Sequence, residues 1–259
     1  FRIMGIDAQE FPKEADFDED RKISLVAGEF GKTLRKISYS VSSDQTRYVL
    51  NGILLSVNAG TFIAVATDGR RLALVEKMLE DPDIVDGDCI LPIKVVHELE
   101  RTLDDDGELV IRLSDSRASF EMENTTIVSK LVEGTYPNYR QVIPGSFQNS
   151  VIIPREKFTE VLNRVGVVVT DSAASIKMAL ETDKIELSAS SAEIGEASEP
   201  MEVSYQGDPV NIAFNPQFLR DPLKSLECDD LTIRFNDEFK PVVMLGDEGF
   251  LYVIMPMRN

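Results

Sequence analysis

The stretches KISLVAGEFGKTLRKISYSV (residues 22–41) and SVIIPREKFTEVLNRVGVVV (residues 150–169) are two copies of one pattern. Each copy begins with a short strand rich in β-branched residues and continues through a turn into an amphipathic helix. The apolar residues that share one helix face are Phe30, Leu34, Ile37 and Val41 in the first copy, and Phe158, Val161, Leu162 and Val165 in the second. This internal repeat predicts two units of one architecture.

The segments that follow these helices also correspond between the copies. A strand pair comes next, at 48–57 with 61–76 in the first copy and at 175–183 with 184–193 in the second. A second amphipathic helix starts near Pro92 and near Asn215, where Asn215 and Pro216 form an N-cap and first-turn pair. Three strands close each copy, at 108–115, 117–124 and 126–133, and at 231–237, 241–247 and 250–257. Antiparallel strands interrupted by isolated helices predict the α+β class, with two helices packed on antiparallel sheets in each unit.

The repeat divides the chain into three parts. Residues 1–20 contain Pro12 and an acidic run from Glu14 to Asp20, and they are expected to be a strand remnant followed by an exposed linker. The first unit is expected to span 21–146 and the second 147–259, with a join near 144–150. Pro222 lies inside the second unit's second helix, where it removes a backbone hydrogen bond at a cost of about 3 kcal/mol. That helix is therefore expected to kink or to end early.

Composition excludes several classes of protein. Of the 259 residues, 43 % are hydrophobic and 28 % charged, as in soluble globular proteins, and no apolar run approaches the roughly 18 residues that span a bilayer. No secretory signal precedes the repeat, so a cytoplasmic protein with no membrane partner is expected. The only histidine is His97, and Cys89 and Cys228 lie outside any CxxC pattern. No disulfide framework, metal site or cofactor is therefore expected.

The charge is unevenly distributed along the chain. The net charge of −18 by itself argues against DNA binding, because phosphates are neutralised by Lys and Arg. The four helices, however, carry ten basic and seven acidic residues, a sum of +3, whereas the rest of the chain sums to −21. Taken one helix at a time, such charged residues are also typical of an ordinary helix face exposed to solvent. If all four faces share one surface, that surface can hold DNA loosely without reading its sequence.

Several segments resemble the bacterial DNA sliding clamp family, the beta subunit of the DNA polymerase III holoenzyme. FRIMGIDAQEFP (1–12) resembles the end of the family's first domain and the linker after it, and RYVLNG (47–52) with ATDGRRLA (66–73) is similar to its middle domain. SKLVEGTYPNYRQVIP (129–144) resembles the second interdomain connection, and YVIMPMRN (252–259) resembles the C-terminus. The resemblance covers essentially the whole chain, and it is specific because the segments occur together and in order.

The resemblance implies repeated DNA-clamp domains whose helices face a central hole and whose sheets lie outside. Residues 1–20 would be the tail of a first domain plus a linker, 21–146 the middle domain and 147–259 the C-terminal domain. The family closes head to tail as a homodimer around double-stranded DNA, whereas this chain alone is expected to be mostly monomeric. The family is a non-catalytic processivity factor of DNA replication, an accessory subunit of a DNA-directed DNA polymerase, and the same role is expected of this chain.

The family's partner site is an apolar groove between the middle and last domains. It binds short linear peptides, typically of glutamine-leucine-x-leucine-phenylalanine type, from the polymerase catalytic subunit, the clamp loader and repair proteins. Carried over by motif, the groove residues are Leu50, Thr67, Gly69, Arg71, Leu72, Pro137, Val142, Pro241, Val253, Met255, Pro256, Met257 and Arg258. Without the resemblance, Leu50, Leu72 and Val142 would be taken as core residues. The chain departs from common members at Arg70, Gln141 and Asn259, at the rim of this groove.

Two further surfaces are implied by the resemblance. The DNA-facing residues would be Arg47, Tyr48, Lys32, Arg35, Lys36, Lys94, Arg101, Lys157, Arg164, Arg220 and Lys224. The ring interface would be Val167, Val168, Glu193, Glu196, Glu199 and Glu202, which match the part of the last domain that meets a basic first domain of the partner. For Tyr48 the alternative is a packed strand residue, and for the glutamates it is a solvated acidic loop.

Two rival functions stay open at this point. The 45 acidic residues could supply paired carboxylates for hydrolysis, but no spacing singles out a pair and no nucleophile elbow or phosphate-binding loop is present. The dependence of any hydrolytic activity on metal would identify an enzyme. An acidic protein-interaction module unrelated to DNA is the second rival, and it would bind the same peptides without encircling DNA.

Overall fold

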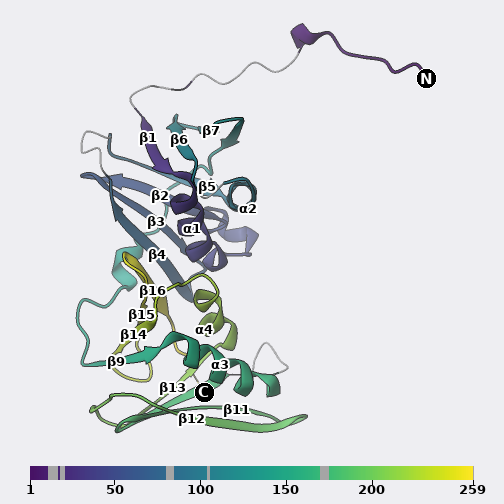
Figure 1. The fold of residues 1–259 in the computed structure, drawn as a ribbon. Helices are drawn as coiled ribbons and strands as arrows, with labels where there is room; N and C mark the ends of the chain where they lie inside the picture. The colour runs from purple at the N-terminus through teal and green to yellow at the C-terminus, as the bar shows by residue number, and fades with distance from the viewer. Residues whose placement is uncertain (11–16, 18–20, 80–84, 104–105, 170–174, 259) are drawn as a thin grey trace.

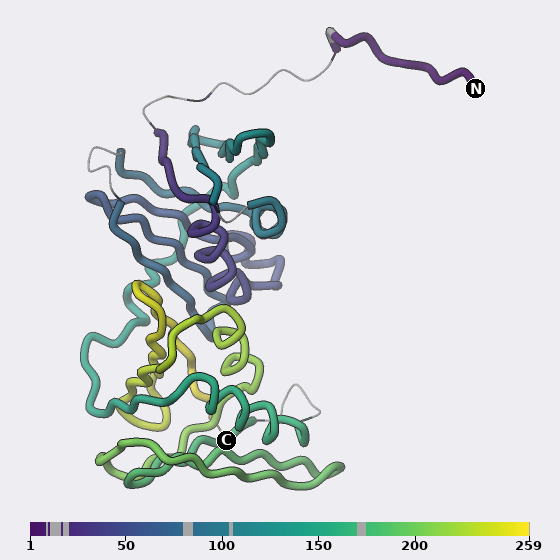
Figure 2. Tube along the Cα trace, in the orientation of Figure 1, coloured from purple at the N-terminus to yellow at the C-terminus, as the bar shows by residue number. Residues whose placement is uncertain are grey.

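The structure is a computed structural model that describes residues 1–10, 17, 21–79, 85–103, 106–169 and 175–258. Of the acidic run at 14–20, only Phe17 is among them, and Asn259 at the end of the C-terminal motif is also outside them. Residues 1–10, with a short 3-10 turn at Ala8–Glu10, extend away from the rest of the chain (Figure 2). The first described strand begins at Lys22.

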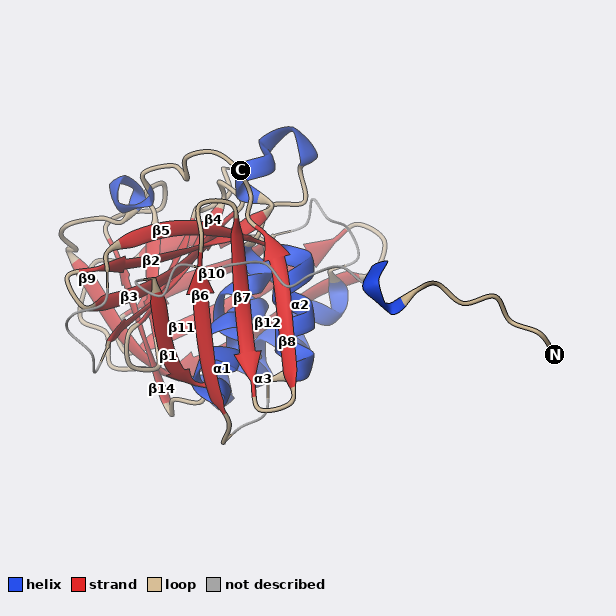
Figure 3. Ribbon diagram, turned by 90° about the horizontal axis from the view of Figure 1, so that it is seen from above, coloured by secondary structure: helices blue, strands red, loops and turns tan. Residues whose placement is uncertain are grey.

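The first unit has ten regular elements in the order strand, helix, four strands, helix, three strands. They are β1 (Lys22–Val26), α1 (Ala27–Ile37), β2 (Gly52–Asn58), β3 (Thr61–Thr67), β4 (Arg71–Met78), β5 (Gly87–Pro92), α2 (Ile93–Thr102), β6 (Glu108–Leu113), β7 (Arg117–Met122) and β8 (Thr125–Lys130). Short 3-10 segments at Ser38–Ser40 and Gln45–Leu50 join α1 to β2. The strands form two antiparallel sheets, β1-β6-β7-β8 and β5-β2-β3-β4, which cross at a steep angle in the view from above (Figure 3).

The second unit repeats this order element by element. It consists of β9 (Asn149–Pro154), α3 (Arg155–Val165), β10 (Ile176–Glu181), β11 (Lys184–Ser191), β12 (Gly195–Glu202), β13 (Val210–Phe214), α4 (Pro216–Leu223), β14 (Asp230–Phe235), β15 (Val242–Leu245) and β16 (Phe250–Ile254). A 3-10 turn at Gly166–Val168 follows α3, and another at Tyr139–Val142 lies in the segment that connects the units. Its sheets are β9-β14-β15-β16 and β13-β10-β11-β12, the same arrangement as in the first unit.

The two units are joined through one strand pair. β4 of the first unit pairs antiparallel with β16 of the second, from Arg71 opposite Ile254 to Val75 opposite Phe250. This joint merges one sheet from each unit into an eight-stranded sheet, β5-β2-β3-β4-β16-β15-β14-β9 (Figure 1). β8 and β12 are edge strands of the two remaining sheets.

The helices cover one side of the eight-stranded sheet, α1 and α2 over the first unit and α4 and α3 over the second (Figure 1). The apolar helix faces are buried as the periodicity predicts, except that α1 ends at Ile37 and Val41 lies beyond it. Phe30 shows how the helix is held, because its ring packs between Phe62 and Phe120 at centroid distances of 6.1 and 6.2 Å. No helix in the described part of the chain is long and apolar enough to cross a membrane.

Pro222 ends α4 early, as the sequence predicts. The helix has eight residues, starts after an Asn215 side chain that accepts a hydrogen bond from the Gln217 N–H at 2.8 Å, and stops one residue after Pro222. Pro222 has no N–H to donate to the carbonyl of Phe218 four residues earlier. The Tyr252 hydroxyl donates to this carbonyl instead, at 3.0 Å. A side chain of the second unit's last strand thus replaces the missing helix hydrogen bond.

The α+β prediction is confirmed, but the predicted single strand at 61–76 is two strands, β3 and β4, and three further strands were not among the predicted elements. β5, β12 and β13 are formed by residues whose apolar content is low or whose run is short. Along β12 exposed residues alternate with less exposed ones, and the exposed ones include Glu196 and Glu202. The strand therefore resembles an acidic loop in composition. The predicted strand at 48–57 begins at Gly52, because residues 45–50 form 3-10 turns.

Candidate functional site

A second apolar cluster lies on the face of the eight-stranded sheet opposite the helices. Because side chains alternate along a strand, Leu72 and Leu74 of β4 point to this face while Ala73 and Val75 point to the helices. Val253 of β16 meets Leu72 directly across the joint. Leu50 also belongs to the cluster, and the connecting segment 131–148 packs on it through Tyr136, Tyr139, Ile143 and Phe147. Three predicted groove residues are therefore brought together where the units meet.

The loop 67–71 forms a rigid edge beside this cluster. The Thr67 hydroxyl donates to the Arg71 carbonyl at 2.6 Å and accepts from the Gly69 N–H at 3.1 Å, while Tyr136 accepts from the Thr67 N–H at 3.1 Å. Gly69 has φ +85°, a conformation that favours glycine. The loop therefore holds Thr67 and Gly69 in one fixed geometry at the edge of the apolar surface.

The C-terminal segment forms a second edge and is bonded directly to this loop. The Met255 N–H donates to the Arg70 carbonyl at 2.9 Å, and the Met257 N–H donates to the Ala213 carbonyl at 2.7 Å. The segment is thus fixed to both units, and the Met255 side chain remains 41 % exposed. Pro137 and Val142 are exposed on the connecting segment, and Pro241, Pro256 and Met257 are half-buried.

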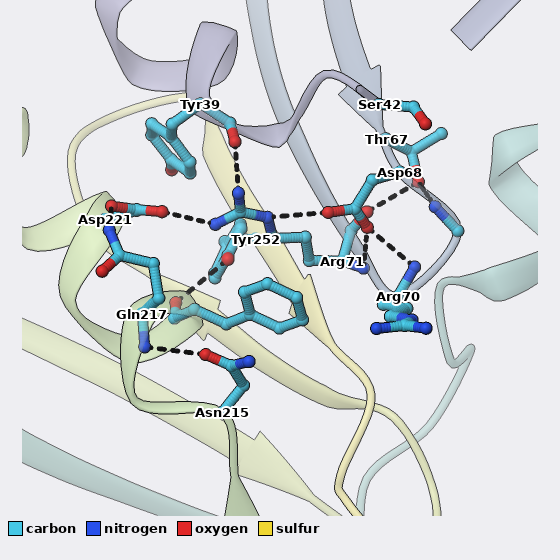
Figure 4. Close-up of polar contacts among 12 residues, drawn as sticks. Tyr39, Ser42, Thr67, Asp68, Arg70, Arg71, Asn215, Gln217, Asp221 and Tyr252 are labelled. Carbon is cyan, nitrogen blue, oxygen red and sulfur yellow. Dashed lines mark hydrogen bonds and ion pairs between the residues drawn. The ribbon is translucent and has the colours of Figure 1, made fainter. Parts of the chain in front are cut away.

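Arg71 is a predicted groove residue whose side chain lies on the other face of the sheet. It precedes Leu72 on β4, so its side chain points to the helix face. Its Nε donates to Asp68 at 3.0 Å, its Nη1 donates to Asp221 at 2.6 Å, and its Nη2 donates to the carbonyl of Tyr39 (Figure 4). The guanidinium is also 4.4 Å from the centroid of the Phe218 ring. Only the Arg71 backbone takes part in the edge of the groove.

The helix cations differ in pairing with carboxylates, and several of the paired ones, among them Arg101, Arg164 and Lys224, are also exposed. Arg35, Lys94 and Lys157 are exposed and come from α1, α2 and α3. Lys32, Lys36, Arg101, Arg164 and Lys224 are each in an ion pair with a carboxylate. Arg220 is half-buried and donates to the Leu162 carbonyl at 3.3 Å. Of the predicted DNA-facing cations on helices, these three exposed ones are the best placed to meet phosphates.

Arg47 and Tyr48 lie beside the groove. Arg47 donates to Asp44 at 3.0 Å and to the Asp68 carbonyl at 2.9 Å, next to the Thr67–Arg71 turn. Tyr48 is exposed, and its hydroxyl lies near Gly134 of the connecting segment. The structure therefore groups these two predicted DNA contacts with the predicted peptide site.

The residues predicted for the ring interface gather at the β12 edge. Glu196, Glu199 and Glu202 are on β12, Glu193 is in the turn before it, and Val167 and Val168 form part of the 3-10 turn after α3. Val167 is exposed, as is Ile194 in the same turn as Glu193. Glu199 accepts hydrogen bonds from Arg164 at 2.8 and 2.7 Å, and this pairing holds the pKa of Glu199 below its ordinary value. Arg164 is thus paired with the edge strand.

A second ion pair between the units lies near the other end of the joint. The Lys36 ammonium of α1 is 2.5 Å from Asp247 of the second unit, and both side chains are largely buried. Burial raises the pKa of Asp247, but hydrogen bonds from Lys36 and from the Cys228 and Glu227 N–H groups outweigh this effect and lower it overall. The carboxylate is therefore more stable in the folded chain than in the unfolded one.

Asp247→Asn is expected to cost about 1.5–3 kcal/mol at pH 7, as for hydrogen bonds to charged groups. A carboxylate whose pKa falls on folding stabilises the protein above its unfolded pKa and loses this contribution as pH falls through the folded value. Urea unfolding at pH 7 and pH 3 should therefore show a smaller acid loss in the variant than in the wild type. Asp115→Asn, at a 94 % exposed side chain, is the control. An equal acid loss in wild type and Asp247→Asn would contradict the expectation.

The polar residues that shape the site are the ones that sequence reasoning missed. Tyr136, Asp68, Asp221 and Asp247 were absent from the predicted groups, although Tyr136 and Asp68 lie inside the quoted motifs 129–144 and 66–73. Tyr136 also lines a pocket of about 550 Å³ between β5 and the connecting segment, next to the apolar cluster. For Asp221 and Asp247 the sequence holds no signal, because their partners come from the other unit.

Comparisons with known proteins place both units in one family. The model of the DNA polymerase III beta subunit, central domain, matches residues 24–138, and that of its C-terminal domain matches residues 140–258. The beta sliding clamp of Chlamydia pneumoniae is 31 % identical over 258 residues, which cover 100 % of this chain and 70 % of the relative.

Two crystal structures are similar to the whole fold. The DNA polymerase III subunit beta of Pseudomonas aeruginosa is 29 % identical, with a TM-score of 0.92 over 98 % of this chain and 70 % of that one. The DNA polymerase sliding clamp of Bacillus subtilis is 26 % identical, with a TM-score of 0.93 over 98 % of this chain and 68 % of that one.

Proposed function

Since the chain belongs to the DNA polymerase III beta subunit family, the beta sliding clamps, we propose that it tethers a polymerase to duplex DNA through the groove between its two units. It is a processivity factor of DNA replication and a non-catalytic accessory subunit. The observation that supports the groove is the apolar cluster at the β4–β16 joint, which is bordered by one segment from each unit.

The partner proposed for this groove is a short peptide with leucine and aromatic anchors. Leu72 and Val253 are each 2 % exposed and would form the base of the site, while Met255 and Val142 are exposed and would contact the peptide from its sides. The fixed Thr67–Arg71 turn presents polar atoms at one end, which suits the polar residue of such a peptide. Peptides of this size that fill a preformed pocket reach micromolar affinity, about −8 kcal/mol. The polymerase, the clamp loader and repair proteins would share the site through such motifs.

DNA would lie against the helix side of the chain. Arg35, Lys94 and Lys157 are exposed there on three different helices, while most of the other helix cations are already paired with carboxylates. Few available cations give weak, salt-sensitive contact with phosphates and no reading of base sequence, which suits a protein that slides. The ring itself would close head to tail through the acidic β12 edge of one copy and a basic surface of the next.

Replacing two groove residues tests this proposal. In Leu72→Ala/Met255→Ala the base and one side of the site lose apolar area, so a labelled peptide of the leucine-aromatic type should bind at least tenfold more weakly, about 1.4 kcal/mol. Fluorescence anisotropy measures the affinity, and Met78→Ala serves as control, because that methionine is exposed at the far end of β4.

Two results would count against the groove. Equal affinity in wild type and double variant would place the peptide elsewhere. No binding by folded wild type would favour a general interaction module over a tether for polymerases.

A further inference from the structure

The Arg71 guanidinium is buried between the two units. Its side chain is 10 % exposed and that of Asp221 is 7 % exposed. Asp68 and the Tyr39 carbonyl, which accept two further hydrogen bonds from it, belong to the first unit, whereas Asp221 belongs to α4 of the second. The Phe218 ring, also from α4, stacks on the guanidinium. One cation therefore bonds to both sides of the joint.

The Arg71–Asp221 pair forms a bridge between the units, and its burial restricts the geometry that this bridge can adopt. Charges removed from water are tolerated only when they are paired and their remaining hydrogen-bonding groups are satisfied. The planar guanidinium fixes the directions of its three bonds, and Asp221 is also held by the Gln217 side-chain amide (Figure 4). A shift of α4 relative to β4 would break the Arg71–Asp221 ion pair and the contact of the guanidinium with the Phe218 ring together. The bridge thus sets one relative position of the units.

The same bridge supports the loop that edges the groove. Asp68 Oδ2 accepts from Arg71 Nε, while Asp68 Oδ1 accepts from the N–H groups of Arg70 and Arg71 at 2.8 and 3.0 Å. The Arg70 carbonyl then accepts from the Met255 N–H of the C-terminal segment. Both edges of the groove are therefore connected, through Asp68 and Arg70, to a charge on the opposite face of the sheet.

We propose that Arg71 and Asp221 are positioning residues, a clasp behind the groove that fixes the spacing of its two edges without touching the bound peptide. The proposal rests on the proposed function of the groove. It assigns Arg71 a role through its side chain on the helix face, whereas the motif alone would place it among the peptide contacts. The affinity of the groove then depends on Asp221, which lies in α4 outside the groove.

Asp221→Asn tests the clasp because it keeps the shape of the side chain and removes its charge. Anisotropy with the leucine-aromatic peptide should show at least fivefold weaker binding, under conditions where circular dichroism shows a folded protein. Lys224→Met is the matched control, since Lys224 bonds to the same carboxylate at 3.0 Å but is 68 % exposed. Its peptide affinity should stay within twofold of wild type.

A distance measurement separates positioning from general loss of structure. Spin labels at Lys130→Cys and Glu202→Cys, one in each unit, with Cys89→Ser and Cys228→Ser, report the relative position of the units. The distance distribution should be broader in Asp221→Asn than in wild type, and saturating peptide should narrow it again. An unchanged distribution with unchanged affinity would overturn the clasp.

A second variant keeps the test decisive if Asp221→Asn does not fold. Arg71→Met/Asp221→Leu removes both buried charges together, which apolar pairs of similar volume often tolerate. This folded variant should also bind peptide at least fivefold more weakly, and wild-type affinity in it would overturn the clasp. If wild type itself binds no peptide, the groove proposal fails instead, so the two failures are distinguishable.

Discussion

Gly249→Ala is expected to lower the free energy of unfolding by about 3 kcal/mol or more. The added Cβ disfavours the left-handed backbone conformation at this position and also collides with a neighbouring strand. Gly249 has φ +73°, and a Cβ there would lie 2.0 Å from the Glu76 carbonyl oxygen. The Glu76 N–H also donates to the Gly249 carbonyl at 2.9 Å, so the two backbones cannot separate without losing this bond. Because the contact lies at the β4–β16 joint, calorimetry should also show the two units unfolding less cooperatively.

Gly69→Ala is the matched control for this variant. Gly69 has a similar φ of +85°, but the nearest atom to an added Cβ is the terminal Nη1 of Arg47, at 2.9 Å, which can move. The free energy of unfolding of the control should therefore fall only by the cost of the left-handed backbone conformation, about 1–2 kcal/mol. Urea unfolding of both variants gives the comparison. Equal losses would mean that the backbone approach at residue 249 does not constrain the joint.

Reversing three helix charges is expected to remove most DNA binding. In Arg35→Glu/Lys94→Glu/Lys157→Glu the exposed cations of α1, α2 and α3 become repulsive toward phosphates. Loss of three phosphate contacts should reduce the slope of log affinity against log salt by about 2.7. At 50–100 mM salt the loss of affinity for a labelled duplex should be at least tenfold, or about 1.4 kcal/mol. Anisotropy over a salt series measures both quantities.

The control must change the net charge equally. Lys22→Glu/Lys130→Glu/Lys177→Glu places three reversals at exposed strand positions, on β1, β8 and β10. If DNA meets the helix side, the control should keep most of the wild-type affinity and slope. Equal losses in both triple variants would show that only the overall charge matters, and the helix face would lose its assigned role.

The sequence allowed the fold to be predicted where local patterns determine it. Phe30 and Leu34, or Phe158 and Leu162, recur at helical spacing, and they are buried against the sheets in the structure. The strand β12 was missed because every second residue on it is exposed and these are Glu196, Ser198, Pro200 and Glu202, so its composition resembles that of a loop. Its strand conformation depends on pairing with β11, a long-range contact that composition does not reveal.

The candidate site shows the same limit. Motifs located Leu72, Val253 and Met255, which the structure brings together, although their contact with a peptide stays a prediction. Arg71 could have been separated from Leu72 by strand alternation alone, since neighbours on a strand face opposite sides. Asp221 could not have been identified, because its partner is 150 residues away in sequence.

The strand joint between the units also gives the chain a polarity. β12 occupies in the second unit the place that β4 has in the first, and β8 corresponds in the same way to β16. At the joint a β4-type edge pairs with a β16-type edge, and these are two different surfaces. Units added through the same pairing are therefore all oriented in the same direction around the ring. A ring made in this manner has a front and a back. Every groove would open toward the same face, and an enzyme docked there would meet the DNA in one direction of travel.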